Sequence, residues 1–216
     1  MNWEILLELW KDERVRRAVW TGVAVVVLLV GYAVYRESQK PRRAPEAELS
    51  LLQAMSMLSN PQGVNTADSL LQDVIARYPG TVEAYRARYY LGYIRLQQGN
   101  LDEAEQAFRA VLGSNLEDPV LRAEAEGHLG TILAARGDWD GALEALGRAR
   151  DLAPLEALKA LYLFRQAEVS FAAGRYDRAV ELLDQMEQEH GRTILFTQEG
   201  RTLRSMARGL MKASGG

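Results

Sequence analysis

The sequence predicts an all-α chain in which a single transmembrane helix near the N-terminus is followed by a right-handed array of helix-turn-helix repeats. Three observations predict this fold class. An uncharged apolar run covers residues 18–35. Four later segments align on an alanine, with spacings of 37, 38 and 37 residues between Ala67, Ala104, Ala142 and Ala179. A glycine-containing turn precedes each of the last three alanines, as expected where one helix ends and the next begins.

The composition excludes several classes of function. The 216 residues include no cysteine, which excludes disulfides, thiolate metal sites and cysteine nucleophiles. Charge is unevenly distributed, because residues 1–45 carry a net charge of +3 and the remaining residues one of −6. An acidic body argues against nucleic acid as a partner, since the phosphate backbone selects basic surfaces. A basic segment beside an apolar run is instead typical of a membrane anchor.

Residues 18–35 form the predicted transmembrane helix. As a helix they reach about 27 Å, close to the hydrocarbon core of a bilayer, and they contain seven valines and two leucines but no charged residue. Arg16 and Arg17 bound the run on one side and Arg36 bounds it on the other. Trp20 lies near one end, at the depth that aromatic rings prefer in a membrane. A buried core helix, the simpler interpretation, needs no such basic stops.

A cleaved signal peptide is the alternative to a retained anchor. Gly31, Tyr32 and Ala33 match the small-x-small pattern of a cleavage site. The apolar run is longer than a typical signal core, however, and bulky Tyr35 and Arg36 follow the possible cleavage site. Both features favour a retained anchor. Basic residues number four on each side of the run, so the charge distribution does not determine the orientation in the membrane.

The segments that flank the apolar run have patterns of their own. In the short tail 1–17, the large apolar residues of one helical face are Trp3, Leu6, Leu7 and Trp10. This amphipathic face indicates either an interfacial helix that docks on a membrane partner, or an extension of the membrane helix with its tryptophans among lipid headgroups. Both interpretations stay open. Residues 36–45 are basic and contain two prolines, which predicts a linker beside anionic headgroups.

The repeats share more than one aligned alanine. A turn glycine is followed two residues later by a large apolar residue, and a proline separates successive units. The first unit is degenerate, with an extended loop at residues 60–65, and the fourth has Gln166-Ala167 in place of leucine-glycine. The third unit has the pattern at Leu129, Gly130, Gly137, Trp139, Ala142, Leu146, Ala149 and Pro154, and the second has it at Leu91, Gly92, Gly99, Leu101, Ala104 and Phe108.

This pattern resembles the tetratricopeptide repeat. The resemblance covers residues 46–212 and implies an α-solenoid of about four helix pairs. A last helix, at about residues 196–212, is expected to cap the array, with residues 213–216 as a flexible tail. The units exceed the standard 34 residues by three or four, which implies longer connections between repeats. The activity that the resemblance implies is the binding of other proteins.

The overall layout also resembles that of the YfgM-like ancillary subunits of the bacterial Sec translocon. Those proteins have a short cytoplasmic tail, one membrane helix and a periplasmic domain of such repeats. The resemblance is one of architecture rather than of motifs. It implies a single-pass protein of the inner membrane, with its repeat domain in the periplasm and a chaperone-like role toward exported polypeptides.

No pattern in the sequence indicates catalysis. His128 and His190 are too few and too far apart for a histidine metal cluster, and no nucleophile-elbow, nucleotide or dinucleotide motif occurs. We expect His128 to pack on the first helix of a repeat or to line a groove, and His190 to lie at a helix end. The sequence therefore predicts a protein that is not an enzyme and that has no cofactor or metal.

The first helix of each repeat is expected to turn one face toward a concave groove that binds protein. Small residues would form the floor of this groove and aromatic residues its walls, which supply contact area at little entropic cost. The alternative is that the chain's own cap or neighbouring repeats cover the aromatic rings. The predicted groove residues are Arg86, Tyr89, Tyr93, Gln97, Gly127, Thr131, Phe164, Glu168 and Phe171.

Two functions follow from these features. The first is a membrane-anchored protein interaction module that acts as a scaffold or chaperone-like helper at an inner-membrane complex such as the protein translocon. The second is a purely structural accessory subunit that joins a large membrane complex through its transmembrane helix. In both, the expected partners are proteins, either subunits of a membrane complex or exported polypeptides, together with membrane lipid.

Overall fold

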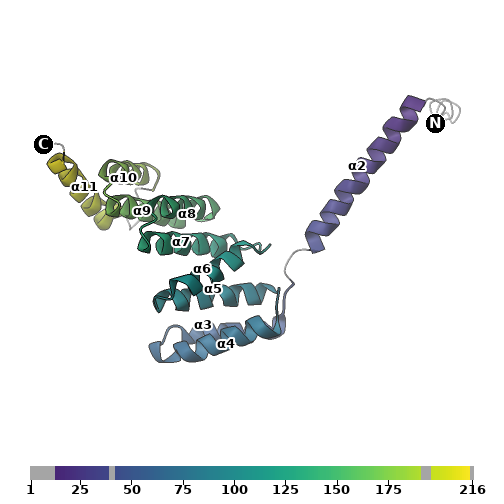
Figure 1. Cartoon of the computed structure of the whole chain (residues 1–216), viewed down its shortest axis with the longest axis horizontal. Helices are drawn as coiled ribbons and strands as arrows, with labels where there is room; N and C mark the ends of the chain where they lie inside the picture. The colour runs from purple at the N-terminus through teal and green to yellow at the C-terminus, as the bar shows by residue number, and fades with distance from the viewer. Residues whose placement is uncertain (1–12, 39–41, 191–195, 215–216) are drawn as a thin grey trace. The chain divides into compact units, whose positions relative to one another are not determined.

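The computed structural model describes residues 13–38, 42–190 and 196–214, and in these ranges the chain is all-α, as predicted (Figure 1). It divides into two compact units, residues 1–40 and 41–216. The second unit is a tetratricopeptide-like solenoid, in which each helix packs on the next along the chain. Its helix pairs are α3 (Pro45–Met57) with α4 (Val64–Arg77), α5 (Val82–Gln97) with α6 (Leu101–Leu112), α7 (Pro119–Ala135) with α8 (Trp139–Leu152), and α9 (Glu156–Ala172) with α10 (Tyr176–His190).

The array ends in the helix that the sequence predicts as its cap. A short π-helical turn, η2 (Phe196–Gly200), leads into α11 (Arg201–Ser214), which packs on α10. Leu203 of α11 lies against the buried cluster of α9 and α10, and Ala207 is fully buried. The last helix therefore covers the end of the core with the inner part of its apolar face.

The first unit contains α2 (Glu13–Ser38), a single helix of 26 residues. Its segment Val19–Ser38 is long and apolar enough to cross a membrane, and none of it is buried against other parts of the chain. The helix continues past Arg16, Arg17 and Arg36 on both sides of the apolar run. Basic residues limit how much of a helix can enter hydrocarbon, but they do not end a helix, because their side chains are good helix formers.

Three glycines end the first helices of the second, third and fourth repeats, as predicted. Gly99, Gly137 and Gly174 have φ values of 79°, 79° and 74°. At the first of them, the amide of Asn100 donates to the carbonyl of Arg95 at 2.9 Å, and the amide of Gly99 donates to that of Leu96 at 3.0 Å. These two bonds satisfy carbonyls that the end of the helix would otherwise leave open.

Small residues set the close approach of the two helices within a pair. A Cβ atom on Gly92 would lie 2.9 Å from the Cβ of Ala107, and one on Gly130 would lie 2.8 Å from the Cγ of Leu146. The four aligned alanines are also fully buried, at positions 67, 104, 142 and 179. The repeat spacing read from the sequence is therefore the spacing of the helix crossings.

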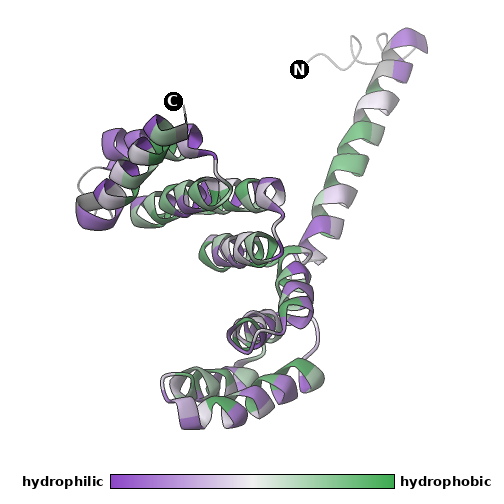
Figure 2. Cartoon of the chain, turned by 60° about the vertical axis from the view of Figure 1, so that its left-hand side comes forward, coloured by the Kyte–Doolittle hydropathy of each residue, from purple (hydrophilic) through white to green (hydrophobic). Residues whose placement is uncertain are grey.

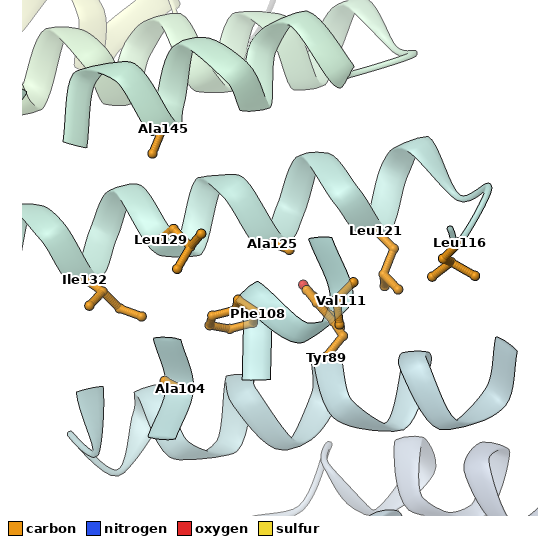
Figure 3. Close-up of a cluster of buried hydrophobic side chains, with 10 residues drawn as sticks. All are labelled: Tyr89, Ala104, Phe108, Val111, Leu116, Leu121, Ala125, Leu129, Ile132 and Ala145. Carbon is orange, nitrogen blue, oxygen red and sulfur yellow. The ribbon is translucent and has the colours of Figure 1, made fainter. Parts of the chain in front are cut away.

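Hydrophobic and hydrophilic residues alternate along the helices of the array (Figure 2), and the buried apolar side chains of the described residues form four clusters. One cluster lies among α5, α6, α7 and α8 and has Phe108 near its centre (Figure 3). Separate clusters lie among α3, α4 and α5, between α7, α8 and α9, and between α9 and α10. Because residues 41–216 hold all four clusters, we expect this unit to fold without the apolar helix.

The first repeat begins with contacts that precede its first helix. The amide of Val82 donates to the carbonyl of Arg42 at 2.9 Å, and the amide of Ala44 donates to the buried carboxylate of Glu83 at 2.7 Å. The loop predicted at 60–65 is shorter than expected, because α4 already begins at Val64. It contains one turn of 3-10 helix, η1 (Pro61–Gly63), and the side chain of Asn60 accepts from the amide of Gln62 at 3.0 Å. A soluble fragment that keeps these contacts begins at Pro41.

Replacing Asp118 with alanine should lower the free energy of unfolding of the 41–216 fragment by about 1 kcal/mol. Its carboxylate caps α7 by accepting from the amide of Leu121 at 3.1 Å, and it also forms an ion pair with Arg86 at 3.1 Å. Urea unfolding followed by circular dichroism measures the loss. The control is Asp151→Ala, which removes an exposed carboxylate that caps no helix and should cost less than about 0.5 kcal/mol.

Candidate protein-binding groove

The predicted groove residues lie on the first helices of the second, third and fourth repeats, α5, α7 and α9. Two of these residues contact a residue of the next first helix that is outside the predicted set. Tyr89 on α5 reaches His128 on α7, and Thr131 on α7 reaches Arg165 on α9. The face shared by α5, α7 and α9 is here called the first-helix face.

An aromatic cluster joins α5 to α7 on this face. The imidazole of His128 stacks on the ring of Phe108, with 5.0 Å between ring centroids. The Nε2 atom of His128 lies 3.2 Å from the hydroxyl of Tyr89. The ring centroids of Tyr93 and His128 are 5.8 Å apart. Since Tyr89 is only 6% exposed and Tyr93 is 38% exposed, the cluster has a buried base and an accessible upper ring.

A second set of contacts joins α7 to α9. A Cβ on Gly127 would lie 2.6 Å from Cε1 of Tyr162, so glycine lets this ring lie against the backbone of α7. The hydroxyl of Thr131 donates to the carbonyl of Gly127 at 3.2 Å and accepts from the guanidinium of Arg165 at 3.3 Å. The small residues predicted as the floor of the groove are therefore packing positions for the following repeat.

The structure divides the predicted residues into buried and accessible ones. Equivalent positions in the three helices, Tyr89, Gly127 and Phe164, are all buried, and Phe164 lies in the cluster shared with α10. Three others are half-buried: Thr131, Arg86 and Phe171. Arg86 forms an ion pair with Asp118, and the ring centroid of Phe171 lies 5.4 Å from that of Tyr176. The predicted residues that a partner reaches most readily are Tyr93, Gln97 and Glu168.

One set of positions on the first-helix face is absent from the predicted groove residues. Tyr90, His128 and Arg165 are separated by 38 and 37 residues, the same spacings as the aligned alanines. Each is half-buried, and each of the last two contacts the preceding repeat. The repeat spacing shows that these three positions are equivalent. Because they hold three different types of residue, the sequence pattern alone does not indicate that they contact the preceding repeat.

Burial shifts the pKa of several groups on this face. It lowers the pKa of His128 to about 4, with a further contribution from the positive charge of Arg165, so the imidazole is neutral near pH 7. It raises the pKa of Tyr162 to about 12, and it raises that of Tyr89 too, with Glu124 adding to both shifts. These groups are therefore uncharged hydrogen-bonding groups rather than acids or bases poised for catalysis.

Burial also raises the pKa of Glu168, although Arg165 opposes the shift and Glu199 adds to it. The accessible part of the first-helix face thus presents an aromatic ring, an amide and a carboxylate. Groups of these kinds bind polypeptide chains through apolar contact and hydrogen bonds. Within the described ranges, no three His, Asp or Glu side chains are placed to hold a metal ion.

The predicted membrane-partner residues fall in two places. Trp3, Leu6, Leu7 and Trp10 lie outside the described residues. Trp20 lies on α2 and is 61% exposed, like the valines and leucines that follow it.

The fold is shared with solved tetratricopeptide proteins. One from Parabacteroides merdae matches with a TM-score of 0.59 at 15% identity, over 77% of this chain and 61% of that one. Cut9, in an APC/C hetero-tetramer with Hcn1, matches with a TM-score of 0.60 at 17% identity, over 74% and 29%. MamA from Desulfovibrio magneticus matches with a TM-score of 0.58 at 15% identity, over 79% and 93%. The chain thus spans about three fifths of the first protein and less than a third of Cut9.

Sequence comparison identifies the same repeats. A family model described as a tetratricopeptide repeat-like domain matches residues 9–154, and a tetratricopeptide repeat model matches residues 129–191. No curated protein matches the chain in sequence. The first match begins before α2 and continues through the third repeat, so the matched segment of this chain includes the apolar helix and the linker. Since this match covers more than half of the chain, the protein belongs to the tetratricopeptide repeat family.

Proposed function

We propose that the protein is a membrane-anchored protein interaction module that acts as a scaffold or chaperone-like helper at an inner-membrane complex such as the protein translocon. The tetratricopeptide fold itself supports a protein–protein interaction module, and Cut9 is one protein of this fold that assembles with another protein. We propose in addition that the apolar helix anchors the protein in the inner membrane and that its partners belong to a complex there.

The observation that carries the binding role is the aromatic cluster on the first-helix face. Tyr93 is accessible, and its ring lies beside that of His128, which stacks in turn on buried Phe108. A ring held in this way loses little conformational freedom when a partner binds, which is why tyrosines often carry much of the binding energy of an interface. Gln97, one turn further along α5, supplies a hydrogen-bonding amide beside it.

Two observations support membrane anchoring. The apolar segment Val19–Ser38 has the length and composition to cross a bilayer and is not buried by the rest of the chain. Tethering would hold the repeat domain at a high local concentration near its partners, which makes weak binding by a single groove effective. The architectural resemblance to translocon-associated subunits supports the inner membrane and a periplasmic repeat domain.

The hypothesis of a structural accessory subunit rests on the exposed surface of α2. The side chains of α2 within the described span are exposed along its length, and Trp20 adds an aromatic ring to them. Lipid or the helices of a partner complex can cover such a surface equally well. If the protein is an accessory subunit, the 41–216 fragment should no longer bind the partner. If it is an interaction module, the fragment should still bind the partner.

Replacing Tyr93 with alanine should weaken partner binding about tenfold, because loss of a central interface tyrosine costs on the order of 1–2 kcal/mol. Affinity purification from native membranes in mild detergent first identifies the partner, and binding of that partner to the 41–216 fragment is then measured by calorimetry. The matched control is Gln188→Ala, an exposed change on α10. Equal affinity of the Tyr93→Ala variant and the wild type would contradict a role for this face.

A further inference from the structure

The two ends of the repeat array both expose apolar side chains. At the N-terminal end of the array, Leu49 and Leu52 of α3 are 74% and 54% exposed, although the other face of α3 is buried in the cluster shared with α4 and α5. The buried residues of α3 are Ala47, Leu51 and Ala54, which pack in the cluster shared with α4 and α5. Leu49 and Leu52 therefore lie on the side of α3 that faces away from the core of the array.

The other end of the array has a similar surface on α11. Met206 is 52% exposed, Leu210 40% and Met211 39%, whereas Leu203 and Ala207 of the same helix pack inward. In the order of helices, α11 holds the place of the first helix of a fifth repeat, since it follows and packs on the second helix of the fourth. Its exposed apolar flank is thus a surface on which a solenoid could continue.

The two end helices carry opposite charge. Helix α3 contains Glu46 and Glu48 and no basic residue, and α11 contains four basic residues and no acidic one. Glu46, Glu48 and Lys212 make no ion pair with any residue that the structure describes, whereas Arg204 and Arg208 pair with Asp184 of α10. A contact between α3 and α11 would therefore bring carboxylates together with cations.

We propose that copies of this chain associate head to tail, with the exposed face of α3 in one copy packed on the exposed apolar flank of α11 in the next. The two helices lie at opposite ends of the array, so they cannot meet within one copy (Figure 1). The junction continues the solenoid across the boundary between copies. It buries Leu49 and Leu52 against Met206 and Leu210 and places the glutamates of α3 near the basic residues of α11.

Charge disfavours a symmetric contact between two α3 helices. Such a contact would bring together four carboxylates, and α3 carries no basic residue to pair with them. The proposed contact uses two different surfaces and is heterologous, so repeated association gives a closed ring or an open row of copies. This self-association is independent of partner binding by the first-helix face, because the surfaces differ.

Cross-linking tests this arrangement directly, because the natural chain has no cysteine. Full-length Leu49→Cys and Met206→Cys proteins are prepared separately in mild detergent, mixed, and treated with a flexible bismaleimide. We expect a cross-linked dimer in the mixture and little in either protein alone. Gln188→Cys, which places the thiol on an exposed site of α10, replaces Met206→Cys in the control and should give only background cross-linking with Leu49→Cys.

The other outcomes overturn the proposal. Cross-linking of Leu49→Cys to itself would show a symmetric contact, and background cross-linking in every mixture would show that the ends stay apart. A charge exchange provides a second test. The Glu46→Lys/Glu48→Lys variant should abolish the Leu49–Met206 cross-link, and a Lys212→Glu change in the other copy should restore part of it. Unfolding of each variant is measured alongside, and because the substituted side chains are exposed, it should stay close to that of the wild type.

Discussion

Replacing Phe108 with alanine should lower the free energy of unfolding of the repeat domain by about 3–5 kcal/mol. The ring is fully buried and lies within 5.0 Å of His128 and 5.8 Å of Tyr89, measured between ring centroids. It also fills the space beside Gly92, where a Cβ would lie 3.1 Å from its Cε1. Its removal leaves a cavity among α5, α6 and α7 that the surrounding helices cannot close without moving (Figure 3).

Phe171 provides the matched control for this prediction. It is half-buried near the end of α9, and its principal aromatic contact is Tyr176. Phe171→Ala should cost clearly less than Phe108→Ala, because water can fill the space that the ring leaves. Both values come from urea unfolding of the 41–216 fragment. Equal losses for the two variants would mean that Phe108 does not form the centre of the core.

The stability of the repeat domain should fall as the pH is lowered from 6.5 toward 4, by up to about 3 kcal/mol from His128 alone. Burial lowers the folded-state pKa of this imidazole from 6.5 to about 4. Between these two pH values the unfolded chain binds a proton that the folded chain excludes, so protonation favours unfolding. Above pH 6.5 both states are neutral at this site, and the contribution is fully present.

A His128→Phe variant isolates this effect. It keeps an aromatic ring against Phe108 but removes the titrating group, so its stability should vary less between pH 6.5 and 4 than that of the wild type. It also removes the hydrogen-bond partner of the Tyr89 hydroxyl, which should cost about 1–3 kcal/mol at every pH. His190→Gln is the matched control, since it leaves the contribution of His128 in place. Parallel stability curves for wild type and His128→Phe would contradict burial of a neutral imidazole.

The accessible surface of the groove is harder to predict than its location. Helical periodicity predicts that Tyr89, Tyr93 and Phe164 lie on the face of their helices that lines the groove. It does not show that Tyr89 is covered by His128, nor that Phe164 lies in the cluster shared with α10. Burial at these positions depends on side chains of other helices, in the next repeat for Tyr89 and in the second helix of the same repeat for Phe164.

The sequence by itself determined the local conformation and the repeat spacing of this protein. Gly99, Gly137 and Gly174 fix the turns, because a left-handed backbone excludes most other residues, and the buried alanines fix where helices cross, because only small side chains fit there. These are constraints on single positions, and a repeated pattern makes them visible.

The tertiary structure alone decided which side chains remain accessible. It buried Tyr89 and left Tyr93 exposed, gave His128 a hydroxyl partner on another helix, and left Leu49 and Met206 uncovered at the two ends of the array. The physical reason is that burial and pKa shifts depend on all the atoms around a group. In a solenoid, those atoms come from the preceding and following repeats, so the same helical position is core in one repeat and surface in the first or last.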